Sequence, residues 1–213
     1  MKKKYSHAFR LLGRDSIFVR LMRNRRNAAS AWCRAPTRSV MQTIRLVRSL
    51  PIAADDTTGS LHDKLAALGA DMMVEAIQMA ADGQLQPLRQ PDAGVTYASK
   101  IEKAEALIDW ALPAAVIDRR VRAFNPFPAA LTQLGDESIK VWAASVVHSD
   151  AVDQVPGTVL RADGEGILVQ TGEGQLLLTE LQRAGARRMP AADFLRGFPI
   201  NPGQRLGVTG ISA

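Results

Sequence analysis

The sequence contains few of the residues from which disulfides, metal sites and membrane segments are built. Its 213 residues include one cysteine, Cys33, so no internal disulfide can form. The three histidines, His7, His62 and His148, are far apart and show no metal-ligand spacing. No apolar run approaches the roughly 20 residues that a membrane-spanning helix requires. We therefore expect a cytoplasmic protein that binds no metal and no membrane.

Positive charge is concentrated in the first quarter of the chain. Residues 1–50 hold 13 basic residues and one acidic residue, a net charge of +12, whereas residues 51–213 hold 14 basic and 20 acidic residues, a net charge of −6. Together these segments give the overall +6. A nucleic-acid surface in the longer segment must therefore be a local cluster rather than a general positive field. Residues 1–45 are compatible with a basic arm, a short amphipathic helix or a disordered segment.

Helical patterns follow this basic segment. Residues 55–83 predict two helices, the first ending at Gly69. The second is expected to bury an apolar stripe that consists of Met72, Met73, Ile77 and Ala80. A polar linker over residues 84–98 and one helical turn within residues 100–109 come next, and Pro113 is expected to open a further helix.

A proline-rich turn separates the helices from a strand-rich half. Pro126 and Pro128 end the preceding helix, and Phe124 and Phe127 are expected to pack on a core because exposing two aromatic rings is costly. Strands are predicted at residues 138–147, 157–161, 166–170 and 175–182, before a short helix at 190–197. The fold class is therefore α+β, a helical lead-in followed by a small antiparallel β-barrel with a short helix.

Several motifs resemble the methionyl-tRNA formyltransferase family and occur in the family's order. They are residues 58–65 (TGSLHDKL), 95–128, 157–160 (GTVL), 171–178 (TGEGQLLL) and 181–189 (LQRAGARRM). The resemblance spans about residues 46–206 and does not include residues 1–45. It implies that residues 46–94 are the remnant of a catalytic domain with its linker. It also implies that residues 95–213 form an OB-like C-terminal domain that binds tRNA.

The catalytic features of that family are not recognisable in this sequence. The resemblance implies an Asn and a His beside a folate pocket, followed by a loop with a catalytic Asp. Residues 40–42 and 46–52 are similar to the strands around that loop, but only three residues separate them. We interpret residues 1–45 as the result of a truncation, a wrong start or a shifted reading frame, which the upstream DNA would test. We expect no catalytic residue, no cofactor in this chain (formyl-tetrahydrofolate is the co-substrate of the full-length family), and no activity of the chain alone.

Basic residues around the junction and in the last motif are the candidate tRNA contacts. They are Lys100, Lys103, Arg119, Arg122, Arg183, Arg187 and Arg188. Arginine suits phosphate because its planar guanidinium donates two parallel hydrogen bonds. Trp110 and Trp142 are expected in the core rather than as stacking platforms, which favours recognition of RNA shape along its backbone. The alternative is a set of solvated charges that Glu102, Glu105 and Asp118 balance.

The resemblance implies a function in translation initiation. The chain is interpreted as the tRNA-binding C-terminal portion of a methionyl-tRNA formyltransferase, a monomer whose partner is initiator methionyl-tRNA. Two alternatives stay open at this point. The chain could be a subunit or fragment that acts with a separate formyltransferase chain, or it could belong to a related formyltransferase with a non-tRNA substrate.

Overall fold

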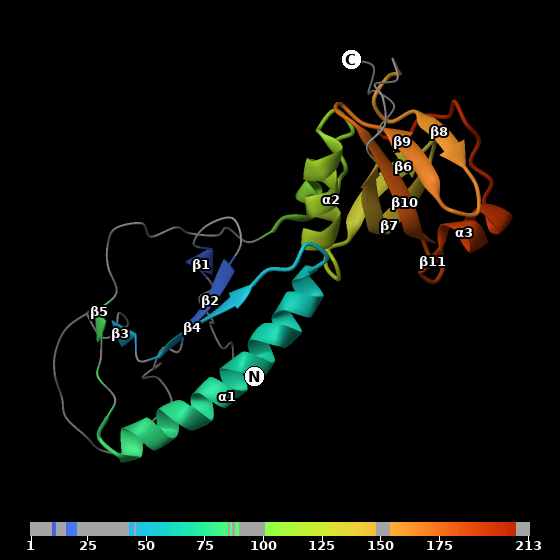
Figure 1. The fold of residues 1–213 in the computed structure, drawn as a ribbon. Helices are drawn as coiled ribbons and strands as arrows, with labels where there is room; N and C mark the ends of the chain where they lie inside the picture. Colours follow the sequence, from blue (N-terminus) through green and yellow to red (C-terminus); the bar gives the residue numbers. More distant parts are fainter. Residues whose placement is uncertain are drawn as a thin grey trace. The chain divides into compact units, whose positions relative to one another are not determined.

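The computed structural model describes residues 10–11, 16–20, 43–44, 46–84, 86, 88–89, 101–147 and 154–207. The chain divides into two compact units (Figure 1). Residues 1–56 and 60–99 form the first, here called the helical unit, and residues 57–59 and 100–213 form the second, the sheet unit. The expected domain boundaries after residues 45 and 94 stay a prediction.

The helical unit is built from one long helix and short strands. Its elements are β1 (Arg10–Leu11), β2 (Ser16–Arg20), β3 (Thr43–Ile44), β4 (Val47–Pro51), α1 (Thr58–Ala81) and β5 (Leu88–Arg89). Strand β2 pairs antiparallel with both β1 and β4, and β3 pairs with β5. Leu65 and Met72 of α1 form a small core with Leu46, Leu50 and Leu68. Among the described residues, no helix is both long and apolar enough to cross a membrane.

Helix α1 is continuous, so the predicted break at Gly69 is wrong. A glycine inside a helix costs only about 1 kcal/mol. The buried residues Leu65 and Met72 lie on either side of Gly69 on one continuous face, and their packing outweighs that cost.

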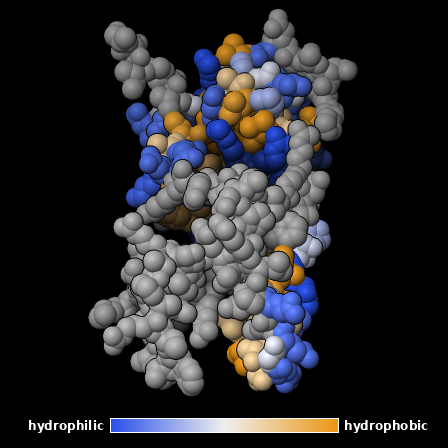
Figure 2. Space-filling model, turned by 90° about the vertical axis from the view of Figure 1, so that its left-hand side faces the viewer, coloured by the Kyte–Doolittle hydropathy of each residue, from blue (hydrophilic) through white to orange (hydrophobic). Residues whose placement is uncertain are grey.

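The predicted apolar stripe of the second half of α1 is only partly buried. Met72 is buried, but Met73 and Ile77 are 46% and 63% exposed, and Ala80 is exposed as well. The leucines of this unit cover a different face of the helix. In Figure 2 the lower coloured surface, which belongs to α1, accordingly shows hydrophobic residues beside hydrophilic ones.

Asp56 organises the entry to α1. Its carboxylate accepts hydrogen bonds from the backbone N–H of Ala53 at 2.8 Å, from Ser60 Oγ at 2.7 Å and from Lys64 Nζ at 2.7 Å. The side chain is almost fully buried. These bonds, that from Lys64 first, lower the pKa of Asp56 from 3.8 to about 2, because they stabilise the charged form.

The lowered pKa predicts an acid-sensitive start of α1. Folding favours the ionised Asp56, so this stabilisation is complete above about pH 4 and is lost as the pH falls toward 2. In thermal unfolding followed by circular dichroism at 222 nm, the difference between the native chain and Asp56→Asn should shrink over that interval. Asp55→Asn, which alters the exposed neighbouring residue, is the matched control. An Asp56→Asn difference that is the same at every pH would contradict this role.

The sheet unit consists of three short helical segments and an antiparallel sheet. The helical segments are η2 (Lys103–Ala106), α2 (Ala114–Ala123) and α3 (Ala191–Gly197). The strands are β6 (Ala130–Leu134), β7 (Glu137–Val147), β8 (Val159–Ala162), β9 (Ile167–Gln170), β10 (Gln175–Arg183) and β11 (Met189–Pro190). Their order is β6-β7-β10-β9-β8, with β11 paired to β10 outside this path.

The sheet surrounds one hydrophobic core, and α2 contributes to it. Ile117 and Val121 of α2 belong to the same buried cluster as Val159, Val169 and Leu176 of the strands. The predicted strands, the hairpin at residues 157–170 and the short helix near residue 190 are confirmed. The α+β class is also confirmed, although among the described residues no strand pairing joins β6 to β8 to close a barrel.

The turn after α2 buries one phenylalanine and exposes the other. Phe124 is 7% exposed, as expected, whereas Phe127 is 66% exposed, so its predicted burial is wrong. The backbone N–H of Ala129 donates to the carbonyl of Phe124 at 2.9 Å and closes the turn. This closure directs Phe124 and Ala129 inward and leaves Phe127 at the exposed tip.

Candidate nucleic-acid interface

The arginine loop, defined as residues 183–188, is a tight connection between β10 and β11. Because β11 pairs antiparallel with β10, the chain must reverse within this loop. Gly185 adopts a φ of 72°, a left-handed conformation that glycine tolerates best. The N–H of Ala186 donates to the carbonyl of Arg183 at 3.1 Å. The hairpin therefore presents Arg183, Arg187 and Arg188 from one short segment.

Arg188 lies over the indole ring of Trp142. Its guanidinium carbon is 5.1 Å from the ring centroid, and Lys140 Nζ is 6.0 Å from the same centroid. Arg188 also forms a two-pronged ion pair with Glu180 of β10. Two cations thus meet at one aromatic side chain, which holds them at the sheet surface by cation–π attraction.

Hydrogen bonds fix Trp142 to both neighbouring segments. The indole Nε1–H donates to Gln182 Oε1 at 2.9 Å, and Gln182 Nε2 donates to the carbonyl of Ala186 in the arginine loop at 2.7 Å. Asn125 Nδ2 donates to the backbone carbonyl of Trp142 at 3.1 Å. Trp142 is only half-buried, so the expectation that it is a core residue is wrong. Trp110 is a core residue as expected, at 4% exposure.

The other two arginines of the loop differ in their surroundings. Arg183 pairs with Glu137 at 3.0 Å, and its guanidinium lies 4.5 Å from the ring centroid of Phe198. Arg187 is exposed and makes no hydrogen bond or ion pair among the described residues. Arg187 is therefore the loop cation with the most freedom to meet an external anion.

The remaining candidate residues are less closely joined to this cluster. Arg119 of α2 is exposed, whereas Arg122 is half-buried and pairs with Asp118 at 3.1 Å. Lys103 is exposed in η2, and Lys100 lies outside the described residues. The backbone carbonyl of Arg122 accepts a hydrogen bond at 3.3 Å from the N–H of Asn125, the residue whose side chain donates to Trp142.

The structure adds Lys140 and Trp142 to the residues that the sequence singled out. Both belong to β7, in which Ile139 and Val141 are buried. Alternation along a strand places Lys140 and Trp142 on the opposite face, so the strand pattern did contain the signal. We call Lys140, Trp142, Arg187 and Arg188 the cation–indole surface.

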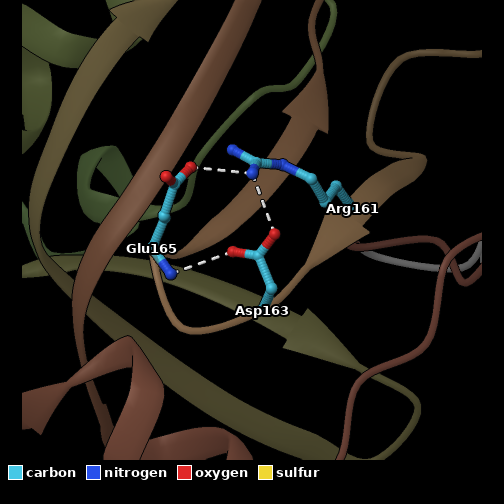
Figure 3. A network of polar contacts seen from close by, with 3 residues as sticks. All are labelled: Arg161, Asp163 and Glu165. Atoms are coloured by element: carbon cyan, nitrogen blue, oxygen red, sulfur yellow. Dashed lines mark hydrogen bonds and ion pairs between the residues drawn. The ribbon is translucent and has the colours of Figure 1, made fainter.

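Arg161, another exposed arginine of the sheet unit, differs in its surroundings from the arginines of the cation–indole surface. Figure 3 shows Arg161 held between two carboxylates of the β8–β9 turn. Its Nη1 donates to Asp163 at 2.8 Å and to Glu165 at 2.7 Å. These partners, Glu165 first, raise the pKa of Arg161. Two carboxylates offset the charge of Arg161, whereas Arg188 has one carboxylate partner, Glu180, so Arg161 is a suitable reference for variants of the cation–indole surface.

The sheet unit also has a surface cleft that lacks convergent reactive groups. It measures about 480 Å³ and is lined by residues 107–111, Pro156 and residues 205–207. Its two charged lining residues are satisfied locally, because Asp109 accepts from the N–H of Ala111 and Arg205 donates to the carbonyl of Pro156. No group of three His, Cys, Asp or Glu residues suited to a metal occurs in the described part of the chain.

Comparison with known proteins relates this chain to one enzyme family. The family model described as formyl transferase, C-terminal domain, matches residues 100–199. Methionyl-tRNA formyltransferase of Acidovorax ebreus is 56% identical over 164 residues, and that of Delftia acidovorans is 57% identical over 159 residues. The matched part of this chain belongs to the methionyl-tRNA formyltransferase family. The cation–indole surface lies entirely within the matched C-terminal domain.

The match covers most of this chain but only part of its relatives. It includes 76% of the chain and 51% of the Acidovorax ebreus protein, and 74% and 49% for the Delftia acidovorans protein. The chain therefore spans about half the length of the curated formyltransferases that it matches.

Solved structures support the fold. A variant of HypX from Aquifex aeolicus superimposes with a TM-score of 0.61 over 89% of this chain and 32% of that one, at 16% identity. The N-formyltransferase from Helicobacter canadensis, solved with folinic acid and dTDP-3-aminofucose, gives a TM-score of 0.51 over 79% and 55%, at 13% identity. HypX has also been solved with tetrahydrofolic acid. At such identities the likeness concerns the fold alone.

Proposed function

We propose that this chain is the tRNA-binding C-terminal portion of a methionyl-tRNA formyltransferase. The cation–indole surface is the observation that carries this proposal, because it gathers three cations from strand β7 and the arginine loop within the matched domain. A surface of this kind binds RNA because its cations neutralise phosphates and release the counterions condensed on them. Initiator methionyl-tRNA is the partner that the family's name and reaction suggest.

The contacts would fix the position of the tRNA rather than read its bases. Arg187 can donate two hydrogen bonds to a phosphate, and Arg188, whose Nε and Nη2 donate to Glu180, keeps Nη1 for one; such contacts carry little sequence information. Lys140 adds a point charge beside them. The indole of Trp142 is bonded to Gln182 and covered by Arg188, so its role is to hold the guanidinium in place rather than to stack on a base.

Formyl transfer, the reaction of the family, requires catalytic groups that lie close together, and the described part of this chain contains no such cluster. Formyl transfer from formyl-tetrahydrofolate to the methionyl amino group requires residues that polarise the formyl group and move protons. The sequence contains no recognisable context for them, and the 480 Å³ cleft has no convergent acid and base. We therefore assign to this chain the binding of tRNA and not the transfer itself.

A filter-binding titration with initiator and elongator tRNA at two salt concentrations tests this function. We expect binding to both tRNAs that weakens steeply as the salt concentration rises, because the contacts are mainly with phosphates. In a parallel assay with formyl-tetrahydrofolate and methionyl-tRNA, the chain alone should give no formylation above background. A folded chain that does not bind tRNA would refute the proposed partner, and formylation by the chain alone would refute the restriction to binding.

A further inference from the structure

Gln182 of β10 lies beside the cation–indole surface, on the face of the sheet that is turned away from the core. In the pairing of β10 with β7 it stands directly opposite Lys140, while the neighbouring pair, Leu181 and Val141, is buried in the core. Successive side chains of a strand point to opposite faces, and side chains of paired strands interact when they are directly opposite or diagonal on one face. Gln182 therefore shares its face with Lys140 and, on the diagonal, with Trp142.

Two hydrogen bonds make the amide of Gln182 a bridge between β7 and the arginine loop. Its Oε1 accepts the indole N–H of Trp142 at 2.9 Å, and its Nε2 donates to the carbonyl of Ala186 at 2.7 Å. The indole N–H can only donate and the backbone carbonyl can only accept, so the bridging group must do both. A carboxylate at the end of a similar side chain would only accept, and an ammonium would only donate, whereas an amide satisfies both partners.

The bridge meets the loop at the residue that precedes its two adjacent arginines. The N–H of Ala186 donates to the carbonyl of Arg183 at 3.1 Å, and the carbonyl of Ala186 accepts from Gln182. That carbonyl and the N–H of Arg187 belong to one planar peptide group, so the amide fixes the backbone from which Arg187 extends. At its other end the amide fixes the indole ring over which Arg188 lies, with its guanidinium carbon 5.1 Å from the ring centroid.

We propose that Gln182 is a positioning residue that holds the arginine loop in the geometry that binds the phosphates of tRNA. Binding orders side chains and loops at a cost in entropy, and a backbone and a ring that are already fixed reduce this cost. Gln182 carries no charge and neutralises no phosphate itself. Its loss should therefore weaken binding without lowering the number of counterions released. The inference rests on the proposed tRNA-binding function.

Filter binding of Gln182→Met to initiator tRNA at several salt concentrations tests this role. Methionine has an unbranched side chain of similar length, but its thioether donates no hydrogen bond and accepts only weakly. We expect tRNA affinity at low salt to fall at least about threefold, while the slope of log K against log salt concentration stays at its native value. Gln204→Met is the matched control, because Gln204 also bonds a loop backbone, the N–H of Asn201 at 2.7 Å, and it should leave the affinity unchanged.

The indole N–H resonance of Trp142 reports on the bridge in the absence of tRNA. The chain contains three tryptophans, and the signal that disappears from the NMR spectrum of Trp142→Phe belongs to Trp142. In Gln182→Met this resonance should shift and its exchange with water should become faster, because its acceptor is lost. Trp142→Phe removes the donor, so adding Gln182→Met to it should lower tRNA affinity less than adding it to the native chain.

The outcomes separate a positioning role from a structural one. A loss of affinity at native slope, together with a shifted indole resonance, supports the proposal. A shifted resonance with native affinity would overturn it, because the bridge would then stabilise the sheet without serving binding. A reduced slope, or an equal loss of affinity in Gln204→Met, would also overturn it. If the native chain bound no tRNA, the proposed function would be refuted and the inference with it, whereas equal binding by the native chain and Gln182→Met refutes the inference alone.

Melting temperatures verify that the variants are folded. Gln182 is half-buried and its side chain lies outside the core, so Gln182→Met should unfold close to the native temperature. If it failed to fold, Trp142→Phe, which removes one end of the bridge and keeps an aromatic ring beneath Arg188, would replace it in the filter-binding test with the same expectation.

Discussion

Replacing Gly172 with alanine is expected to destabilise the sheet unit by about 3 kcal/mol or more. A Cβ at residue 172 would lie 1.8 Å from the carbonyl oxygen of Ala111 and 2.6 Å from its carbonyl carbon. Both atoms belong to the backbone, so no change of rotamer relieves the collision. The Gly172 N–H also donates to the carbonyls of Trp110 at 2.9 Å and Leu112 at 3.2 Å, and these bonds would be broken.

The consequence extends to α2, because the same turn holds the beginning of that helix. The N–H of Ala114, the first residue of α2, donates to the carbonyl of Glu173 at 2.9 Å. If the turn moves away from residues 110–112, this bond and the burial of Ala114 are lost together. Domains of this size are stable by only about 5–15 kcal/mol, so a loss of this magnitude should lower the melting temperature by more than about 10 °C.

Gly164→Ala is the matched control for this experiment. Gly164 lies in the β8–β9 turn and does not adopt a left-handed φ, and no atom lies within 4 Å of the position that an alanine Cβ would occupy there. Its replacement should change the free energy of unfolding by less than about 0.5 kcal/mol. Equal melting temperatures for Gly172→Ala and the native chain would show that residues 171–174 do not pack against residues 110–112.

The turn at residues 171–174 also shows how far sequence reasoning reaches. Its glycines predicted a turn between two strands, and that prediction is confirmed. The need for Gly172 in particular arises from Ala111, about 60 residues earlier, and no local pattern contains that contact. Local alternation and turn residues thus located the strands of the sheet unit, whereas the packing between distant segments came only from the structure.

Three differences from the sequence-based expectations have the same origin. Gly69 does not end α1, because tertiary contacts of Leu65 and Met72 outweigh its low helix propensity. Phe127 is exposed, because the closure of its turn directs Phe124 inward instead. Trp142 was expected in the core rather than as a stacking platform, but its neighbours in β7, Ile139 and Val141, are the buried residues. In each case the residue type alone suggested that a side chain is buried or that a helix ends. Contacts with residues distant in the sequence determined whether it did.

The sequence predicted the arginines of the candidate site but not the contacts that they make. The motif at residues 181–189 located the arginine loop, and the structure describes Arg183, Arg187 and Arg188 there. The motif did not reveal that Arg188 reaches Trp142, because that contact joins the arginine loop to strand β7, and the two residues are 46 positions apart in the sequence. Whether these residues bind tRNA stays a prediction, and it can be tested by removing the charge.

The double variant Arg187→Ala/Arg188→Ala is expected to lower tRNA affinity about tenfold or more at low salt. It should also reduce the slope of log K against log salt concentration by roughly 1 to 2, since each lost phosphate contact removes about one released counterion. Arg187 is exposed and free of partners among the described residues, and Arg188 is held at the surface by Trp142. Filter binding at several salt concentrations measures both quantities.

Two controls separate a direct contact from a general effect of charge. Arg161→Ala removes a cation of matching exposure, 44% against 43% for Arg188, but one that Asp163 and Glu165 already neutralise, so tRNA affinity and salt slope should stay near native values. Glu180→Gln added to the double variant removes the carboxylate that loses its partner Arg188. If this triple variant bound tRNA like the native chain, the loss would be due to repulsion by Glu180, and the assignment of Arg187 and Arg188 as phosphate contacts would be wrong. An affinity that stays low with a reduced slope is the result that direct contact requires, because only the removal of phosphate-binding groups lowers the number of counterions released.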